Sequence, residues 1–212
     1  MKEKIIVIGG GGHSKVVISI IKKLKQFEIV GFTDIQVKEN ILGIPYIGTD
    51  SIIEKYRFEG VTNLVIGIGQ IKSSKIRRDI VAFAKSYNYN FPVIISPNSI
   101  INEDVNIAEG TVVMDGVVIN SGTKIGAFSI INTNSSIDHD CKIGGFTHIA
   151  PGVTLSGEVI IGENVLIGTS ANVIQGINIC DNVLVSAGSS VQKDIVKPGI
   201  YRGIPARFIK GK

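Results

Sequence analysis

The chain has 212 residues, a length that allows one large or two small domains and a sizeable core. Ile, Val and Gly are abundant, Trp is absent, and aromatic residues are few, with 8 Phe and 5 Tyr. This composition favours β-branched strands joined by glycine turns. The basic residues behind the net charge of +4 are scattered, so no segment resembles a nucleic-acid-binding patch.

The N-terminus leads directly into an apolar strand, without a signal-peptide cleavage site or a segment long enough to cross a bilayer. The two cysteines, Cys141 and Cys180, have no metal-ligand spacing. They fit a reducing compartment. We therefore expect a cytoplasmic protein with no bound metal and no membrane insertion.

Residues 1–95 alternate strand and helix signals, which predicts an α/β Rossmann-like domain. The expected elements in chain order are a strand over Ile5–Ile8, a glycine turn over Gly9–Gly12, a helix over Val16–Leu24, a strand over Ile29–Thr33, an extended segment over Ile44–Ile47, a helix from Asp50 to about Arg57, a strand over Leu64–Gly69, a helix from Ser73 to about Tyr87, and an extended segment over Phe91–Ile95.

A glycine turn between a first strand and a helix exposes backbone N–H groups at the positive end of that helix, where phosphate binds. Asp34 ends the second strand, and its carboxylate could accept from a ribose or a base. Ser14 replaces the third glycine of the dinucleotide fingerprint, which argues against NAD. A purely structural turn is the alternative, because glycine is also the default residue of tight turns.

From Ile101 to Val191, within the second predicted domain (residues 96–212), the sequence follows a period of six, with a branched aliphatic at every sixth position and no insertion. The sixteen positions are Ile101, Ile107, Val113, Ile119, Ile125, Ile131, Ile137, Ile143, Ile149, Leu155, Ile161, Ile167, Val173, Ile179, Val185 and Val191. Three hexapeptides make a triangular coil of about eighteen residues, and such coils stack as parallel sheets. The pattern predicts an all-β left-handed parallel β-helix of about five coils, followed by a C-terminal tail.

A small or β-branched residue stands four positions after each aliphatic, where the coil turns a corner. Cys141 falls in this register. We therefore interpret it as a core residue rather than a nucleophile.

Two of the three histidines, His139 and His148, fall within the repeats but outside the inward register, so both are expected at the outer surface. Imidazole is the usual general base for an amine or hydroxyl, and a neighbouring carboxylate raises its basicity. His139 is flanked by Asp138 and Asp140, which fits that role. A chance surface histidine is the alternative.

His139 and His148 are nine residues apart, which is half a coil, so they should lie on different parts of one prism. They meet only if faces of two subunits pack together. This spacing leads to the hypothesis of a site shared across an interface, most simply in a homotrimer.

Together, the start IGGGGHSKVV, the uninterrupted hexapeptides, the His-Asp-Cys segment followed by His-Ile-Ala-Pro-Gly, and the ending Tyr-Arg-Gly-Ile-Pro-Ala-Arg resemble one family over nearly the whole chain. It comprises the bacterial acetyl-CoA-dependent acetyltransferases of nucleotide-linked 4-amino-sugars and the related sialic acid O-acetyltransferases. The resemblance implies a homotrimer that holds the nucleotide-sugar in the Rossmann-like domain and acetyl-CoA between neighbouring β-helices.

By this resemblance, His139 matches the catalytic base and Asp140 the adjacent acid. His148 matches a residue near the thioester or pantetheine. The other implied contacts are Gly157, Thr169 and Ala187 for acetyl-CoA, and Gly11, Gly12, His13, Thr33, Asp34 and Gly69 for the nucleotide-sugar.

The implied reaction is direct transfer of the acetyl group to a sugar amine, without an acetyl-enzyme. O-acetylation of sialic acid is the first alternative, because the histidine chemistry is the same. A non-catalytic trimeric scaffold and an NAD-binding oxidoreductase are the others. The nucleotide (UDP, dTDP or GDP) and the stereochemistry of the sugar stay open.

Overall fold

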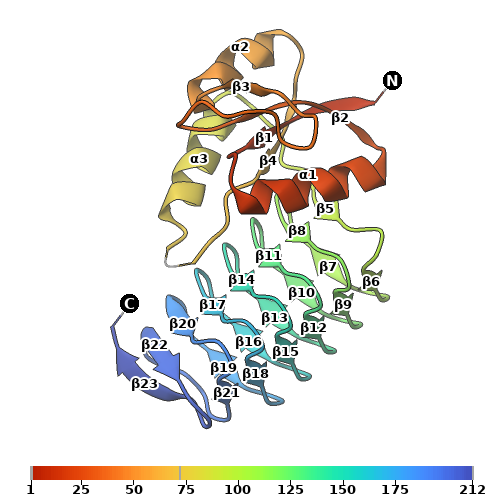
Figure 1. Ribbon diagram of the computed structural model, residues 1–212. Coiled ribbons are helices and arrows are strands. Elements are labelled where there is room, and N and C mark those ends of the chain that lie inside the picture. Colours follow the sequence, from red (N-terminus) through yellow and green to blue (C-terminus); the bar gives the residue numbers. More distant parts are fainter. Residues whose placement is uncertain (1, 72, 212) are drawn as a thin grey trace. The chain divides into compact units, whose positions relative to one another are not determined.

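A computed structural model describes residues 2–71 and 73–211 (Figure 1). The chain forms two compact units, Met1–Gly69 with Lys75–Pro97, and Gln70–Ser74 with Asn98–Lys212. The short segment Gln70–Ser74 thus groups with the second unit, although the residues on both sides of it belong to the first. No helix within the described ranges is long and apolar enough to span a membrane.

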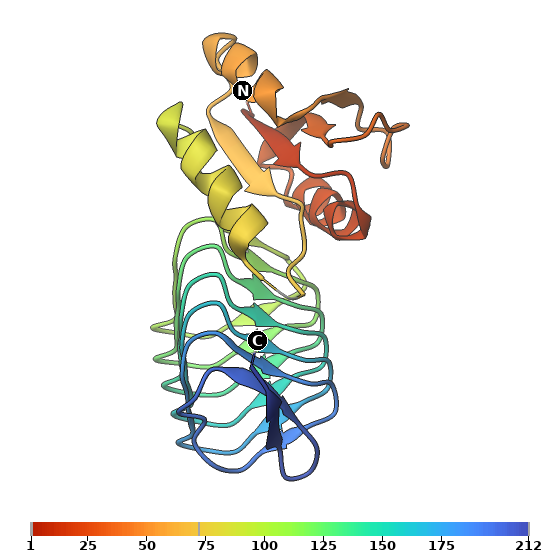
Figure 2. The same cartoon turned by 90° about the vertical axis from the view of Figure 1, so that its left-hand side faces the viewer.

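The first unit is built on a parallel sheet of four strands in the order β3-β2-β1-β4. Helix α1 covers one face of this sheet and α3 lies on the other (Figure 2). Its elements are β1 (Glu3–Ile8), α1 (Gly12–Leu24), β2 (Phe27–Thr33), β3 (Tyr46–Gly48), the 3-10 helix η1 (Asp50–Ile52), α2 (Ile53–Phe58), β4 (Asn63–Ile66), α3 (Lys75–Ser86) and β5 (Ile94–Ile95). This arrangement confirms the predicted α/β fold.

Several element boundaries in the first unit differ from the sequence prediction, and two of them lie beside the glycine turn and the end of the central strands. Helix α1 begins at Gly12 rather than Val16, because its first turn carries none of the apolar residues on which the periodicity depends. Strand β4 ends at Ile66 rather than Gly69. The neighbouring strand β1 ends at Ile8, which pairs with Ile66. Residues after Ile66 therefore have no residue of β1 to pair with.

The second unit is the predicted left-handed parallel β-helix, whose coils stack in chain order (Figures 1 and 2). Strands one coil apart pair in parallel at a shift of eighteen residues, as Lys124 pairs with Lys142 and Ile130 with His148. The first sheet holds β6 (Ile100–Ile101), β9 (Val118–Ile119), β12 (Ser136–Ile137), β15 (Thr154–Leu155), β18 (Asn172–Val173) and β21 (Ser190–Val191).

The second sheet holds β7 (Asn106–Ile107), β10 (Lys124–Ile125), β13 (Lys142–Ile143), β16 (Ile160–Ile161) and β19 (Asn178–Ile179). The third includes β8 (Val112–Val113), β11 (Ile130–Ile131), β14 (His148–Ile149), β17 (Leu166–Ile167), β20 (Val183–Val185), β22 (Gly199–Arg202) and β23 (Arg207–Lys210). The last two strands are antiparallel and form the C-terminal tail.

The six-residue register is buried from Val113 to Val191, as predicted. Its first two members, Ile101 and Ile107, are only half-buried. They belong to the first coil of the stack, so no earlier coil covers them. The corner residues, four positions after these aliphatics, are also buried from Thr111 to Ala171, and Cys141 is one of them.

Removing a buried inward side chain should destabilise the stack, because the cavity lies between coils held in a fixed register. We expect Ile137→Ala to lower the free energy of unfolding by about 2–5 kcal/mol, measured by urea denaturation. Ile174→Ala is the matched control, because Ile174 lies in the same unit and is 46% exposed. Equal losses for both variants would contradict this account of the core.

Candidate active site

His139 lies on an outer corner of the β-helix, in the turn between β12 and β13. Stacking fixes this turn from both neighbouring coils. The N–H of Asp140 donates to the carbonyl of Ser121 at 3.0 Å, and the N–H of Glu158 donates to the carbonyl of His139 at 2.9 Å. Asp140 adopts φ 57°, a left-handed conformation that aspartate tolerates better than most residues.

The inside of this turn is held by the buried hydroxyl of Thr123 in the preceding coil. Its Oγ1 donates to the carbonyl of Asp138 at 2.8 Å and accepts from the N–H of Cys141 at 3.1 Å. These two bonds bracket His139 and Asp140. The backbone that carries the imidazole is therefore tied to the core.

The outside of the turn is held by a ladder of polar side chains at intervals of eighteen residues. The amide Nδ2 of Asn102 donates to Oδ1 of Asn120 at 2.7 Å, and Nδ2 of Asn120 donates to Oδ1 of Asp138 at 2.9 Å. The same carboxylate oxygen accepts from the N–H of His139 at 2.8 Å. The bonds from Asn120 and His139 lower the pKa of Asp138, so this carboxylate carries its charge beside the imidazole.

The imidazole of His139 is paired with Asp140, with 2.9 Å between Nδ1 and Oδ2. Both side chains are open to solvent, at 47% and 64% exposure. The hydrogen bond to Asp140 raises the pKa of His139, and the charges of Asp138, Asp140 and Glu158 add to this effect. Because a carboxylate only accepts, Nδ1 carries the proton in the neutral ring, and Nε2 presents its lone pair.

Gly157 lies one coil beyond His139 and leaves room for that nitrogen. A Cβ at position 157 would stand 2.5 Å from Nε2 of His139, closer than real side-chain contacts. Any other residue here would displace the ring or cover Nε2. The structure thus brings together three of the predicted site residues, His139, Asp140 and Gly157, at one corner.

Cys141 follows this turn but points into the core, as predicted. Its Sγ donates to the carbonyl of Ser156 at 3.3 Å. Burial raises the pKa of the Cys141 thiol. A buried, protonated thiol is a poor nucleophile, so direct transfer fits this corner better than an acetyl-cysteine intermediate.

His148 lies on β14, in a different sheet from the strand that precedes His139. Its Nδ1 is 2.7 Å from the carbonyl of Gln70, and its Nε2 is 3.0 Å from the amide nitrogen of Asn132. A carbonyl only accepts and an amide NH₂ only donates, so these contacts select the neutral tautomer with the proton on Nδ1. The side-chain amide of Gln70 in turn donates to the carbonyl of Phe146 at 2.5 Å.

Thr169 and Ala187 are exposed in the turns that follow β17 and β20, which are the next strands of the sheet that contains β14. They are one coil apart, and the N–H of Gly188 donates to the carbonyl of Thr169 at 2.9 Å. The residues expected to contact acetyl-CoA therefore divide between two corners of one chain, with Gly157 beside His139 and the others on the edge next to His148.

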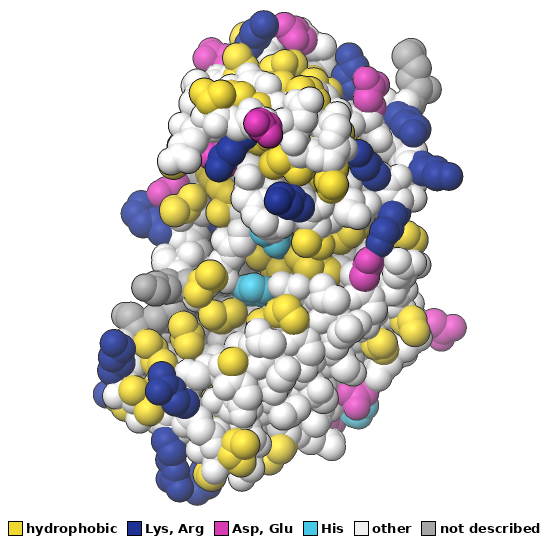
Figure 3. Space-filling view, in the orientation of Figure 1, with side chains coloured by type: hydrophobic (Ala, Val, Ile, Leu, Met, Phe, Trp, Pro, Cys, Tyr) yellow, Lys and Arg dark blue, Asp and Glu magenta, His cyan; other side chains and the backbone are white. Residues whose placement is uncertain are grey.

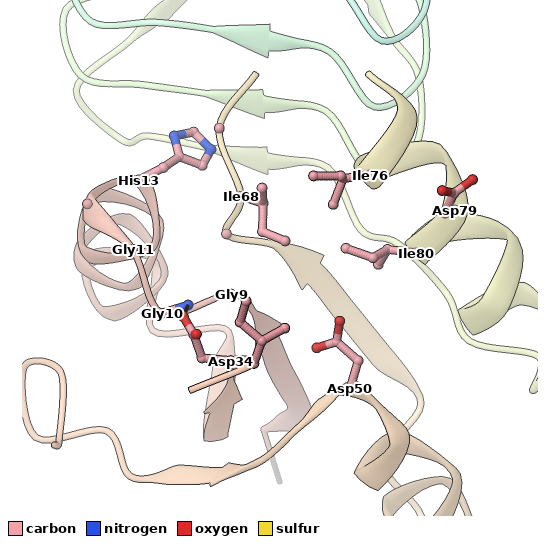
Figure 4. Close-up of a pocket in the computed structure, with 14 residues that line it drawn as sticks. Gly9, Gly10, Gly11, His13, Asp34, Asp50, Ile68, Ile76, Asp79 and Ile80 are labelled. Atoms are coloured by element: carbon pink, nitrogen blue, oxygen red, sulfur yellow. Dashed lines mark hydrogen bonds between the residues drawn. The ribbon is translucent and has the colours of Figure 1, made fainter. Parts of the chain in front are cut away.

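The first unit contains a cavity of about 490 Å³ where β1, β2 and β4 end (Figure 4). This is the point at which the strand order reverses, the usual ligand crevice of parallel α/β sheets. Five of the six residues expected to contact the nucleotide-sugar line it: Gly11, Gly12, His13, Asp34 and Gly69. Thr33 does not line the cavity; it is buried, and its Oγ1 donates to Oδ1 of Asp50 at 2.5 Å.

The glycine turn and Asp34 form one wall of this cavity. The N–H of Gly10 donates to Oδ2 of Asp34 at 2.9 Å. A Cβ on Gly10 would lie 2.7 Å from the ring of Phe32 and 2.8 Å from that carboxylate oxygen. Gly11 is the N-cap residue of α1 and makes no side-chain capping hydrogen bond. The first N–H groups of this thirteen-residue helix thus lie at a cavity edge where they suit a phosphate.

Sequence reasoning missed Asp50 and the apolar wall made by Ile68, Ile76 and Ile80. Asp50 stands at the start of a helix, where an acidic residue is ordinarily explained by the helix terminus alone. Ile76 is 64% exposed on α3, a property that only the structure reveals. Within residues 2–71 and 73–211, no group of three His, Cys, Asp or Glu side chains is arranged to hold a metal.

The stacked hexapeptide coils, together with the comparisons that follow, define the chain as an acyltransferase of the hexapeptide-repeat class. Residues 158–193 match the hexapeptide repeat of succinyl-transferase, and residues 4–82 match the PglD N-terminal domain. No curated protein matches the sequence significantly.

Solved structures identify the family. PerB from Caulobacter crescentus, in complex with CoA and GDP-perosamine, is 32% identical, with 97% of each chain covered and a TM-score of 0.91. The acetyltransferase domain of PglB from Neisseria gonorrhoeae, in complex with acetyl coenzyme A, is 32% identical over 99% of this chain and 100% of that one, with a TM-score of 0.91. WeeI from Acinetobacter baumannii is 25% identical, covers 98% and 100%, and has a TM-score of 0.86. The chain belongs to the family of nucleotide-amino-sugar acetyltransferases.

The hydrogen bond from Asp140 makes a testable contribution to the titration of His139. Asp140→Asn removes a negative charge and the strongest acceptor of Nδ1–H, so the pKa of His139 should fall toward its ordinary value of 6.5. An NMR titration of the His139 ring protons measures this shift. Asp104→Asn, an exposed aspartate in another coil that also has positive φ, is the control and should change nothing. An unchanged His139 pKa in Asp140→Asn would contradict the described pairing.

Proposed function

We propose that this enzyme transfers the acetyl group of acetyl-CoA to the 4-amino group of a nucleotide-linked amino-sugar, with His139 as the general base. The observation that carries this proposal is the His139–Asp140 pair, which leaves Nε2 open beside Gly157 on a corner of the β-helix. Family membership supports the two substrates, because relatives were solved with CoA, acetyl-CoA or GDP-perosamine. Binding and chemistry are divided between the two units.

The first unit holds the nucleotide-sugar in this proposal. The N–H groups at the start of α1 bind the phosphates, and Asp34 contacts the ribose or base. Gly11, Gly12, His13 and Gly69 line the space around them. Thr33 acts indirectly, since its hydroxyl orients Asp50 at the cavity wall.

The second unit binds acetyl-CoA and carries the base. Nε2 of His139 removes a proton from the sugar amine as the nitrogen attacks the thioester carbonyl. The carbon–sulfur bond then breaks, and CoA leaves as the thiol after taking up a proton. Asp140 stabilises the imidazolium that forms. Positioning both substrates at one site supplies the proximity that a bimolecular transfer requires.

Basic side chains support acetyl-CoA binding at the C-terminal end of the β-helix. Lys and Arg gather over β22 and β23 (Figure 3), where Arg202, Arg207 and Lys210 are exposed. Coenzyme A carries several phosphate charges, which such a patch attracts. We include Gly157, Thr169, Ala187 and His148 in the acetyl-CoA site along the two corners described above.

The division of these residues between two corners favours a homotrimer with sites between subunits. His139 and Gly157 of one subunit would face His148, Thr169 and Ala187 of a neighbour, and three equivalent interfaces close the ring. The same proposal places the enzyme in the cytoplasm, where acetyl-CoA and nucleotide-sugars are made.

Removing the base should abolish most of the rate without unfolding the protein. We expect His139→Ala to lower kcat by about 10²–10⁴-fold, measured as thiol release from acetyl-CoA with a panel of nucleotide-linked amino-sugars. Ser121→Ala is the matched control, because Ser121 is exposed at the same position one coil earlier. Near-full kcat in a folded His139→Ala protein at neutral pH would refute the assignment of the base.

A complementation experiment tests whether the site is shared. His139→Ala and His148→Ala should each be weakly active alone. Random mixed trimers should regain activity at about a quarter of their interfaces, those that pair an intact His139 with an intact His148. If the mixture were no more active than the two single variants, both residues would belong to a site within one chain. Full activity of His148→Ala alone would remove His148 from the site.

A further inference from the structure

The cavity of the first unit has an apolar wall suited to a flat ring. Ile76 and Ile80 lie one turn apart on α3, and Ile68 follows β4, so the three side chains line one side of the space (Figure 4). Ile76 is 64% exposed, and Ile35, which also lines the cavity, is 87% exposed. Exposed aliphatic side chains that converge on a cavity provide packing surface for a bound base.

The polar side chains of this cavity are almost all hydrogen-bond acceptors. They are the carboxylates of Asp34, Asp50 and Asp79; the imidazole of His13, which can both donate and accept, is the remaining polar side chain. Within residues 2–71 and 73–211, no Lys, Arg, Asn, Gln, Ser or Thr side chain belongs to the lining. An ionised carboxylate cannot donate. The side chains therefore select a ligand group that presents N–H or O–H donors.

The three carboxylates differ in the capacity that remains for a ligand. Asp34 already accepts from the N–H groups of Gly10 at 2.9 Å and Gln36 at 3.0 Å, one on each oxygen. Asp79 is at the exposed rim and pairs with Lys75 at 2.8 Å.

Asp50 is half-buried and its carboxylate is directed into the cavity (Figure 4). The hydroxyl of Thr33 donates to its Oδ1 and fixes the group in place. Among the described residues, none donates to the other oxygen, Oδ2. Asp50 is thus a fixed acceptor next to the apolar wall, with at least one oxygen open to the space.

The bases of nucleotide-sugars differ in what they offer to such a group. Guanine presents N1–H and N2–H₂ side by side, two donors that match the two oxygens of one carboxylate. Uracil and thymine present a single N–H between two carbonyl oxygens, and these oxygens would lie against the negative charge. A purine also covers more of the isoleucine wall than a pyrimidine does.

We propose that this cavity selects guanine, so that the acceptor substrate is a GDP-linked amino-sugar. The carboxylate of Asp50 recognises the base by accepting hydrogen bonds from it. The inference rests on the proposed function, because it takes this cavity to be the nucleotide-sugar site. The acetyl-transfer chemistry at His139 does not depend on which base is bound.

Calorimetry with GDP, UDP and dTDP on the 212-residue protein tests the proposal. GDP should bind at least about tenfold more tightly than either pyrimidine nucleotide, and Asp50→Asn should weaken GDP binding by about tenfold or more. UDP affinity should change by less than about threefold in the same variant. The Asn Oδ1 still accepts from Thr33, so the local fold is kept. Glu59→Gln, an exposed residue outside the cavity, is the control and should leave both affinities unchanged.

The outcomes separate this inference from the proposed function. UDP or dTDP binding as tightly as GDP would overturn the selection of guanine, while acetylation of a UDP-linked amino-sugar would still support the proposed function. GDP preference that survives Asp50→Asn would overturn the role of Asp50. Failure of all three nucleotides to bind a protein that still binds acetyl-CoA would overturn the proposed function itself.

Discussion

The eighteen-residue register of the β-helix is the constraint on which the site depends. It places Asn120 against Asp138, Thr123 against Cys141 and His139 against Gly157, each pair one coil apart. The imidazole is consequently held by backbone on both sides, by a buried hydroxyl inside and by a polar ladder outside. A shift of one residue in the stack would separate all three pairs, because successive residues of a strand face opposite sides.

Charge explains why this corner suits proton transfer. Three carboxylates, those of Asp138, Asp140 and Glu158, surround one exposed imidazole and favour its protonated form. Since Nδ1 is committed to Asp140, proton uptake occurs at Nε2. This is the nitrogen that the missing side chain of Gly157 leaves accessible. Basicity, tautomer and access therefore result from neighbours that the fold aligns, and none requires a metal or a nucleophilic side chain.

The β-helix and the outward position of His139 could be predicted from the sequence, because the hexapeptide repeat is a local pattern. An unbroken period of six fixes which side chains point inward, so an outward histidine beside aspartates is visible without coordinates. The contact between His148 and the carbonyl of Gln70 joins residues 78 positions apart, which no local pattern reveals. Asp50 was missed for a similar reason, since its importance depends on the cavity that β1, β2 and β4 form together. Thr33, expected in the pocket, is instead buried behind Asp50.

The pH dependence of kcat/KM for the unmodified enzyme tests the central claim most directly. His139 acts as a base only when neutral, and its pKa is raised above 6.5, so activity should fall as the pH drops through that higher value. The acid limb should coincide with the titration of the His139 ring observed by NMR in the free enzyme. A rate that stays constant while this ring becomes protonated would contradict the account.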